Sequence, residues 1–435
     1  MRFRTLSVVA LGLLLGSRAA AQDLAGDWQG TLEAGAQQLR VIVKLTKVED
    51  GQWTGTFSSV DQGDWGSRSD VSAVVLQGQH VTFSVTAIGG SYQGTLSADG
   101  TSIEGIWKQR QPLPMTLRRS TPETAWKDPA AHTIQPVTVD KNVKLEVLDW
   151  GGSGRPMVFL AGLGNTAHVF DKFAPKFMAS HRVYGITRRG FGASSVPPDG
   201  YEADRLGDDV LAVLAALKLD RPVLVGHSLA GEEMSSIASR HPDRVSGLVY
   251  LDAGYPYAFY DAEHGNLNLD LIELRHKLDQ LAMGNAPPDT RPIIKELLET
   301  DLPRFERDLQ NTKKDLDATP PAVLASQPPG PPQNVPIQTR AIMNGTQKFT
   351  KLSAVPILAI YALPHDAGPL FASDPAGRAA REAQDLQTTG MQADAFEKGV
   401  SSARVVRLPH ANHYVFRSNE ADVLREMNAF LATLR

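Results

Sequence analysis

The chain contains no cysteine among its 435 residues. Disulfide bonds are therefore excluded, and so is a lipid-carrying cysteine behind an export signal. Lysine and arginine number 44 against 48 acidic residues, which gives a net charge of −4. A chain without a basic excess lacks the electrostatic footprint of a nucleic-acid-binding protein. We therefore expect no nucleic-acid partner.

The only clearly apolar stretch near the N-terminus, Leu6 to Gly16, is too short for a membrane span, which needs about 20 apolar residues. It follows the basic start Met1-Arg2-Phe3-Arg4 and precedes Ala19-Ala20-Ala21, a small-residue cleavage site. This order is typical of a secretory signal peptide over residues 1–21. The mature chain would begin at Gln22 with 41 basic and 48 acidic residues, a net charge near −7. We expect an exported protein without a membrane span, in the periplasm rather than fully secreted.

Residues 22–120 have short alternating apolar runs and many glycines, which predict a separate all-β domain. The pattern Gly-x-aromatic-polar-Gly-Thr-apolar occurs three times, from Gly26, Gly51 and Gly90. It places the aromatic and the final apolar residue on one strand face, with a glycine between them that lets the strand coil. A meander or lipocalin-like barrel is predicted, with the aromatics in its core or lining a ligand pocket. Residues 121–134 are predicted to be a linker in which Trp126 docks on one of the domains.

A short strand, Pro222-Val223-Leu224-Val225, leads into Gly226-His227-Ser228-Leu229-Ala230-Gly231 and then into a helical stretch. A serine at a sharp turn between a buried strand and a helix is a nucleophile elbow, which lifts the hydroxyl out of the backbone. Ala230 stands at the usual second glycine, and its single methyl is small enough for that position. Ser228 is therefore the candidate nucleophile.

A serine needs an imidazole that takes its proton and a carboxylate that orients that imidazole. The loop Pro409 to Phe416 offers His410 and His413, and we prefer His413 because it lies farther into the loop and apolar residues follow it. The acid is expected at Asp366, just after the penultimate apolar strand over residues 355–363. Asp252, at the end of the preceding strand over residues 247–251, is the alternative.

Two backbone amides should face the oxyanion of the tetrahedral intermediate. Leu229 follows the nucleophile and supplies the first; Leu163, in the glycine loop after the strand Met157–Leu160, is expected to supply the second. Glu232 and Glu233 are interpreted as carboxylates favoured by the dipole at a helix N-terminus.

With these motifs in order, residues 135–435 resemble the α/β-hydrolase superfamily. Thr187 to Ser194 is similar to the turn common after the fourth strand in that superfamily, and Arg240 to Val245 to the usual exit from the nucleophile helix. The resemblance implies an α/β fold, a mostly parallel sheet flanked by helices, and no cofactor or metal. A helical cap is expected after the sixth strand, over residues 255–352, with helices near 269–281 and 292–309 and a proline-rich crossing at 320–332.

The expected function is that of an exported serine hydrolase acting on a small or medium carboxylic ester through Ser228, an acid and His413. Hydrolysis of amides, lactones or carbon-carbon bonds would use the same residues. The alternative from another class is a ligand-binding protein in which the hydrolase fold is a silent scaffold and the barrel binds.

Overall fold

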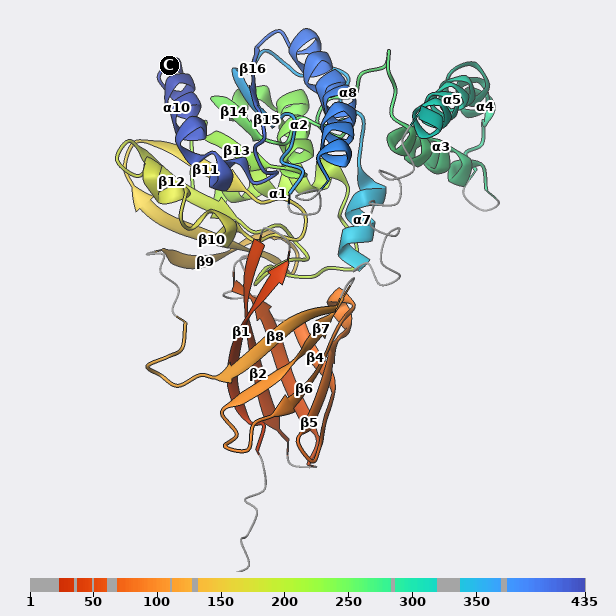
Figure 1. Cartoon of the computed structure of the whole chain (residues 1–435). Helices are drawn as coiled ribbons and strands as arrows, with labels where there is room; N and C mark the ends of the chain where they lie inside the picture. The colour runs from red at the N-terminus through yellow and green to blue at the C-terminus, as the bar shows by residue number, and fades with distance from the viewer. Residues whose placement is uncertain are drawn as a thin grey trace, which may run out of the picture.

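The computed structural model describes residues 23–34, 37–48, 51–60, 69–109, 112–126, 132–282, 286–318, 337–368 and 374–434. The expected signal peptide and the proline-rich crossing at 320–332 lie outside these residues. Within the described part, no helix has both the length and the apolar character needed to cross a bilayer. Two bodies are visible in Figure 1, a β-barrel in red and orange and an α/β domain in yellow to blue.

The first body is a closed barrel of eight strands, each antiparallel to the next along the chain. The strands are β1 (Gly26–Ala34), β2 (Gln37–Lys47), β3 (Trp53–Ser59), β4 (Ser69–Gln77), β5 (His80–Val85), β6 (Gly90–Leu96), β7 (Ser102–Lys108) and β8 (Pro112–Arg119). Pairing of β1 with β8 closes the barrel. Its interior is filled by buried side chains, among them Trp28, Phe83, Tyr92 and Trp107. The all-β prediction is confirmed, and these aromatics form the barrel core.

The repeated glycines of the barrel lie where neighbouring strands approach most closely. A Cβ atom at Gly30 would stand 2.6 Å from the Thr116 carbonyl oxygen, and one at Gly55 would stand 2.3 Å from that of Lys44. A Cβ at Gly94 would meet the Glu104 carbonyl oxygen at 2.9 Å. Contacts this short leave no room for a side chain. The glycine of each repeat is therefore required by the close approach of a neighbouring strand.

The second body contains a mixed eight-stranded sheet in the order β16-β15-β14-β13-β11-β12-β10-β9. These strands are β9 (Thr133–Asp140), β10 (Val143–Gly152), β11 (Arg155–Leu160), β12 (His181–Ile186), β13 (Val223–His227), β14 (Gly247–Leu251), β15 (Ile357–Ala362) and β16 (Ala403–Leu408). The pairs β9–β10 and β10–β12 are antiparallel, and all others are parallel. The central strands β13, β14 and β15 are buried along their whole length because both faces of the sheet are covered.

Helices pack on both faces of this sheet. They include α1 (Ala203–Ala216), α2 (Ala230–Arg240), α8 (Pro375–Gly399), α9 (Val415–Ser418) and α10 (Glu420–Leu431), with the short turns η3 (Ala167–Phe170), η4 (Ala174–Phe177) and η5 (Pro242–Arg244). One apolar cluster joins α1, α2 and α8 to one face, and a second joins η3, η4 and α10 to the other. Because β11, β13, β14, β15 and β16 are parallel, their carboxyl ends meet at one edge of the sheet. Ligands bind at this edge in such folds.

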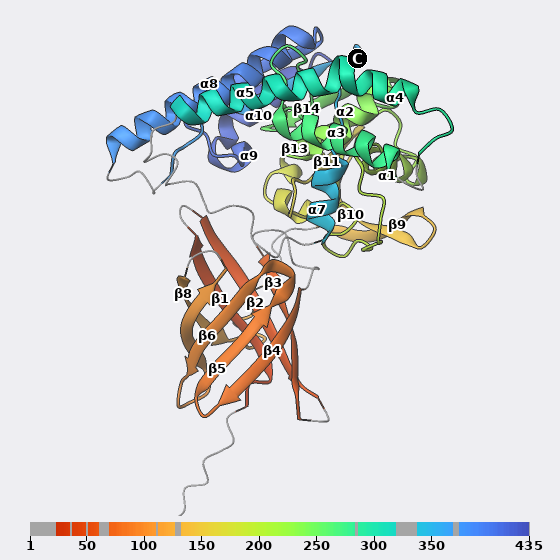
Figure 2. The same cartoon turned by 90° about the vertical axis from the view of Figure 1, so that its right-hand side faces the viewer.

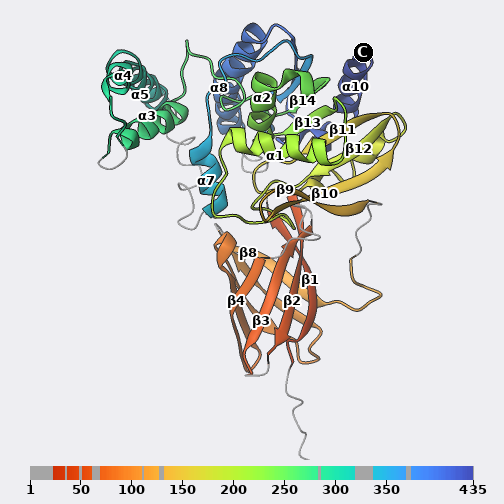
Figure 3. The same cartoon turned by 180° about the vertical axis from the view of Figure 1, so that it is seen from behind.

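Between β14 and β15 the chain forms α3 (Leu267–Leu281), α4 (Arg291–Glu296), the π-helical turn η6 (Leu297–Asp301), α5 (Leu302–Ala318) and α7 (Ile337–Gly345). Figures 1 and 3 show α3, α4 and α5 as a group beside the sheet, and Figure 2 shows α5 running across the view. Within this insertion, the amino group of Lys348, in the segment after α7, binds Asp270 of α3 at 2.6 Å. The insertion occupies the place where the sequence predicts a cap.

Trp126 docks on the barrel. Its backbone N–H donates to Gln29 of β1 at 3.2 Å, and the Arg40 guanidinium lies over its ring at 5.6 Å. The Gln29 side chain in turn donates to the Thr124 carbonyl oxygen at 2.8 Å. The first part of the predicted linker is therefore held on the barrel wall.

Candidate active site

Ser228 lies at the sharp turn between β13 and α2, at the carboxyl end of the sheet. Its φ of 52° is in the left-handed region, which a non-glycine residue adopts only under constraint. The constraint comes from close packing of the helix: a Cβ at Gly231 would stand 2.1 Å from the Ala253 carbonyl oxygen, and Gly226 lies against Met234. Ala230 is fully buried here and its methyl group fits. The local geometry is that of a nucleophile elbow.

The loop after β11 passes directly against this turn. A Cβ at Gly162 would lie 3.1 Å from the Ser228 Cβ, so only glycine permits the approach. Outside helices and strands, the backbone hydrogen bonds of the described residues include no donation from the N–H groups of Leu163 or Leu229. Both amides that the sequence nominates are therefore available to an oxyanion beside Ser228.

A buried ion pair holds the same loop from behind. The Arg188 guanidinium, just after β12, binds Glu233 of α2 and donates to the Ala161 carbonyl oxygen at 2.8 Å. Arg188 and Glu233 are both buried. The dipole interpretation of Glu233 is incomplete, because its main partner is this arginine, which joins the nucleophile helix to the oxyanion loop.

His413 is oriented by Asp252. Its Nδ1 lies 2.6 Å from the Asp252 Oδ2, so Nδ1 carries the proton and Nε2 is left as the base. Asp252 is fully buried, ends β14, and has a φ of 47°. Burial alone would raise its pKa, but hydrogen bonds from His365 and His413 outweigh that and lower the pKa to about 2. The carboxylate is therefore charged throughout the physiological range.

The prediction of Asp366 as the acid is wrong in this geometry. Asp366 is exposed, and its carboxylate accepts the N–H of Gly368 at 3.1 Å within its own loop. Asp252, the alternative, contacts His413 because β14 lies next to the nucleophile strand and its turn points the side chain toward the sheet edge. The Asp252 Oδ1 also accepts the Ala362 N–H at 3.0 Å, which ties it to β15. His410 faces Glu382 at 3.6 Å, with its side chain 61% exposed.

A second histidine, His365, occupies the end of β15 where the acid is expected. Its Nε2 lies 2.8 Å from the Asp252 Oδ2, and its Nδ1 lies 2.9 Å from the Asp385 Oδ2 of α8. Burial disfavours charge on this imidazole, but the two carboxylates raise its pKa to about 10. The site therefore contains a chain of alternating charges, Asp385, His365 and Asp252, that ends at His413. A histidine between a carboxylate at a strand end and one on a helix has no signature in the sequence.

Two tyrosines from the segment after β14 complete the site. The Tyr255 hydroxyl donates to the Asp252 Oδ2 at 3.0 Å. Tyr257 lies beside Ser228, and burial raises the pKa of its phenol above the usual range. Both phenols remain neutral, Tyr257 beside the nucleophile and Tyr255 as a donor to the acid. Neither tyrosine stands in a motif that the sequence alone would single out.

His227 and Glu232 are fully buried next to the nucleophile. Burial lowers the pKa of His227 to about 3, so the ring is neutral, and its Nε2–H donates to the His413 carbonyl oxygen at 3.1 Å. His227 therefore anchors the histidine loop. Burial raises the pKa of Glu232 well above its usual value, with Glu233 adding to the effect. Burial therefore favours the neutral form of Glu232, whereas the interpretation from the helix dipole assumes a charged carboxylate.

A cavity of about 760 Å³ lies between the helical insertion and α8. Tyr255 and Pro256 line one end of it, α3 and α5 provide a side that includes Asn268 and Asp308, and α8 provides the opposite side. Its volume is in the range of pockets for small organic ligands. Tyr255, whose hydroxyl donates to Asp252, connects this cavity to the candidate site, whereas Ser228 and His413 are not among its lining residues.

The strand order and the elbow correspond to a known family, whose model, described as the alpha/beta hydrolase fold, matches residues 155–314. The α/β body is an α/β-hydrolase domain. Among curated proteins, it is similar to 2-(acetamidomethylene)succinate hydrolase of Mesorhizobium japonicum, with 32% identity over 28% of this chain and 42% of that protein. It is also similar to 2-hydroxymuconate semialdehyde hydrolase of Pseudomonas sp. (strain CF600), with 33% identity over 30% of this chain and 49% of that protein.

The chain thus spans between two fifths and one half of the length of these curated relatives. Among solved structures, the hydrolase domain is similar to E-2-(acetamidomethylene)succinate hydrolase, with 20% identity, a TM-score of 0.42 and coverage of 69% of this chain and 100% of the other. An esterase of Exiguobacterium antarcticum has 13% identity and a TM-score of 0.44, with coverage of 69% and 100%.

Proposed function

We propose that this protein is an exported serine hydrolase that cleaves carboxylic esters of small or medium size. The observation that carries the proposal is the arrangement at the sheet edge, where Ser228 adopts a strained turn against Gly162 and His413 is held by the buried carboxylate of Asp252. These are the parts that acyl transfer requires: a nucleophile, an oriented base and an oxyanion site. A binding protein has no need of this combination.

In the proposed reaction, the His413 Nε2 removes the proton of the Ser228 hydroxyl as its oxygen attacks the ester carbonyl. The oxyanion is received by the N–H groups of Leu163 and Leu229. His413 then returns the proton to the departing alcohol, leaving an acyl group on Ser228, and a water molecule activated by the same nitrogen releases the acid. Asp252 keeps its charge throughout and stabilises the imidazolium that forms twice in each cycle.

Small or medium substrates are favoured by the cavity of about 760 Å³ that ends at Tyr255. Asp261, Asp308 and Asp315 line this cavity, so we expect uncharged or cationic esters to be preferred over anionic ones.

Cleavage of amides, lactones or carbon-carbon bonds is the second candidate, because the relatives described above are named as hydrolases of quite different compounds. The same triad and oxyanion amides would serve. Ligand binding by the barrel gains no support, since aromatic side chains fill its interior.

The test uses the purified full-length mature chain with a fluorophosphonate probe and a panel of chromogenic esters, amides and lactones. The probe is expected to label Ser228, and the S228A variant is expected to lose labelling and about 10⁶ in turnover. Labelling that persists in S228A would remove Ser228 from this role. Measuring the N-terminus of the chain recovered from the periplasm, expected at Gln22, tests the export proposal separately.

A further inference from the structure

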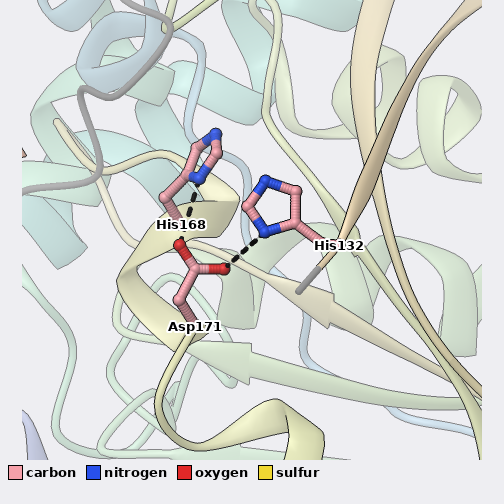
Figure 4. A group of neighbouring side chains, drawn as sticks. All are labelled: His132, His168 and Asp171. Atoms are coloured by element: carbon pink, nitrogen blue, oxygen red, sulfur yellow. Dashed lines mark hydrogen bonds and ion pairs between the residues drawn. The ribbon is translucent and has the colours of Figure 1, made fainter. Parts of the chain in front are cut away.

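A second cluster of ionisable side chains lies in the hydrolase domain, formed by His132, His168 and Asp171. His132 immediately precedes β9, whereas His168 and Asp171 come from η3 and the residue after it. Figure 4 shows both imidazoles directed at the carboxylate of Asp171 from different elements. The His168 Nδ1 lies 3.1 Å from one carboxylate oxygen, and the His132 Nδ1 lies 3.3 Å from the other.

These separations match those between the ligands of a metal ion. Ligands about 2.0 Å from a tetrahedral zinc ion lie about 3.3 Å from one another. One donor atom from each of the three residues can be chosen so that all lie within 4.8 Å of one another. Two imidazoles and one carboxylate are a common set of protein ligands for zinc, with a fourth position left for water or another ligand.

The surroundings also match those of a metal site. A ligating imidazole usually donates its other N–H to a carboxylate, and the His168 Nε2 faces the Glu146 Oε1 at 3.5 Å. Glu146 is itself held by the Thr187 hydroxyl at 2.6 Å, and the Asp171 carboxylate accepts the Trp150 indole N–H at 2.9 Å. The carboxylates of Glu146 and Asp171 are thus each fixed by a further hydrogen bond.

The cluster is buried but can be reached. The side chains of His132, His168 and Asp171 are 5%, 1% and 8% exposed. A cavity of about 280 Å³ adjoins His168 and Asp171, and its other lining residues include Arg40 of the barrel and Arg417 of the hydrolase domain. Glu146 and Asp171 are two buried carboxylates beside His168, and buried negative charge needs positive charge nearby. A divalent cation would supply it.

We propose that His132, His168 and Asp171 bind a divalent transition-metal ion, with zinc as the best fit to this donor set. The ion would join the start of β9 to η3 and so tie the chain that leaves the barrel linker to the hydrolase domain. Its role is structural, because none of its ligands belongs to the network of Ser228, Asp252 and His413. The expectation that the reaction itself needs no metal is unaffected.

The test uses the untagged mature chain, stripped with a chelator and titrated with Zn²⁺ by calorimetry. We expect one equivalent to bind and to raise the melting temperature. Substitution with Co²⁺ should give the visible absorption typical of a four-coordinate ion. H132Q and D171N should each weaken Zn²⁺ binding more than about 100-fold, and E146Q about 10- to 100-fold because Glu146 orients His168.

Two control variants place the ion. H264Q changes a histidine in an exposed group with Asp261 and Glu263, and it should leave the affinity unchanged. H365Q changes the other buried His-Asp-His group, at the active site, and should also leave it unchanged. Circular dichroism and a cooperative melt of each variant before titration separate loss of a ligand from loss of folding.

Two outcomes would overturn the proposal. One is the absence of stoichiometric binding to the stripped wild-type chain, in which case the cluster holds a proton instead: burial opposes charge on His168, but Asp171 and Glu146 raise its pKa to about 9. The other is Zn²⁺ binding that survives in H132Q and is lost in H365Q, which would place the ion at Asp252.

Discussion

At the scale of single residues, Asp252 is the hub of the candidate active site. One of its oxygens lies within hydrogen-bond distance of His413, His365 and the Tyr255 hydroxyl, and the other accepts a backbone N–H. A fully buried carboxylate is costly unless donors surround it, and here they do. Its position is therefore rigid, which a residue that orients the base must be.

The assignment of the acid can be tested by paired substitutions. D252N should lower turnover about 10⁴-fold, because an amide at this position favours the wrong tautomer of His413. D366N should leave turnover within about a factor of two, since an exposed carboxylate that caps its own loop contributes little. The measurement is kcat/KM on one chromogenic ester, with melting temperatures as a check on folding. The reverse ranking would return the acid to Asp366.

His365 is predicted to set the pH range of the enzyme as a positioning residue. Its positive charge lies beside Asp252 and faces His413, with ring centroids 6.3 Å apart. In H365Q that charge is absent, so protonation of the base becomes easier and the acidic limb of the pH–rate profile should move up by about one unit. A uniform loss of kcat without any shift in the profile would mean that His365 is only structural.

The same histidine makes a prediction for stability. Its pKa is about 10 in the folded chain against 6.5 for an ordinary histidine, so its contribution is fully present below pH 6.5 and is lost as the pH rises toward 10. The difference in unfolding free energy between wild type and H365Q should therefore shrink across that interval. Chemical denaturation at pH 6, 8 and 10 measures it. A difference that grows with pH would contradict a charged His365.

At the scale of elements, the site depends on strand ends that lie side by side. Ser228 directly follows β13, Asp252 directly follows β14, and His365 and His413 lie in the loops after β15 and β16. Parallel pairing of these four neighbours brings their carboxyl ends to one edge. Arg188, after β12, then links the loop of β11 to α2. Each element supplies one part, so the chemistry depends on the register of the whole sheet.

Close packing between the barrel strands leads to a prediction about the stability of the barrel. G55A would place a methyl group 2.3 Å from the Lys44 carbonyl oxygen of the neighbouring strand, and the pair would have to separate. We expect a loss of about 1–3 kcal/mol in the stability of the barrel. The control is G390A in α8, where the nearest atom would be 3.9 Å away and alanine suits a helix. If both variants melt at the wild-type temperature, the neighbouring strand can accommodate the methyl group of G55A and the prediction is wrong.

At the scale of the whole molecule, the residues of the candidate site all come from one body. Ser228, Asp252, His365 and His413, together with the oxyanion amides, belong to the hydrolase domain. The barrel has its own filled core and closes on itself through β1 and β8. The proposed division of labour is therefore catalysis in one domain and another task, such as docking, in the other.

Truncation tests this division. A chain that begins at residue 121 should keep activity on small soluble esters within about a factor of three, because none of the described barrel residues belongs to the candidate site. The measurement compares kcat/KM of the truncated and mature chains, after a cooperative melt shows that the truncated chain is folded. Complete loss of activity in a folded truncated chain would mean that the barrel completes the active site.

The sequence by itself determined the elements and the local turns of this protein. Alternation and glycine repeats predict the barrel, apolar runs predict strands that the structure contains, and the small residues around Ser228 predict an elbow, because each depends on neighbours along the chain. The choice between Asp252 and Asp366, and the roles of His365, Tyr257 and Arg188, were decided only by the tertiary structure. Both aspartates follow a buried strand, and only the direction of each turn decides which carboxylate meets His413. The same holds for His132 and Asp171, which become neighbours only when η3 packs beside the start of β9.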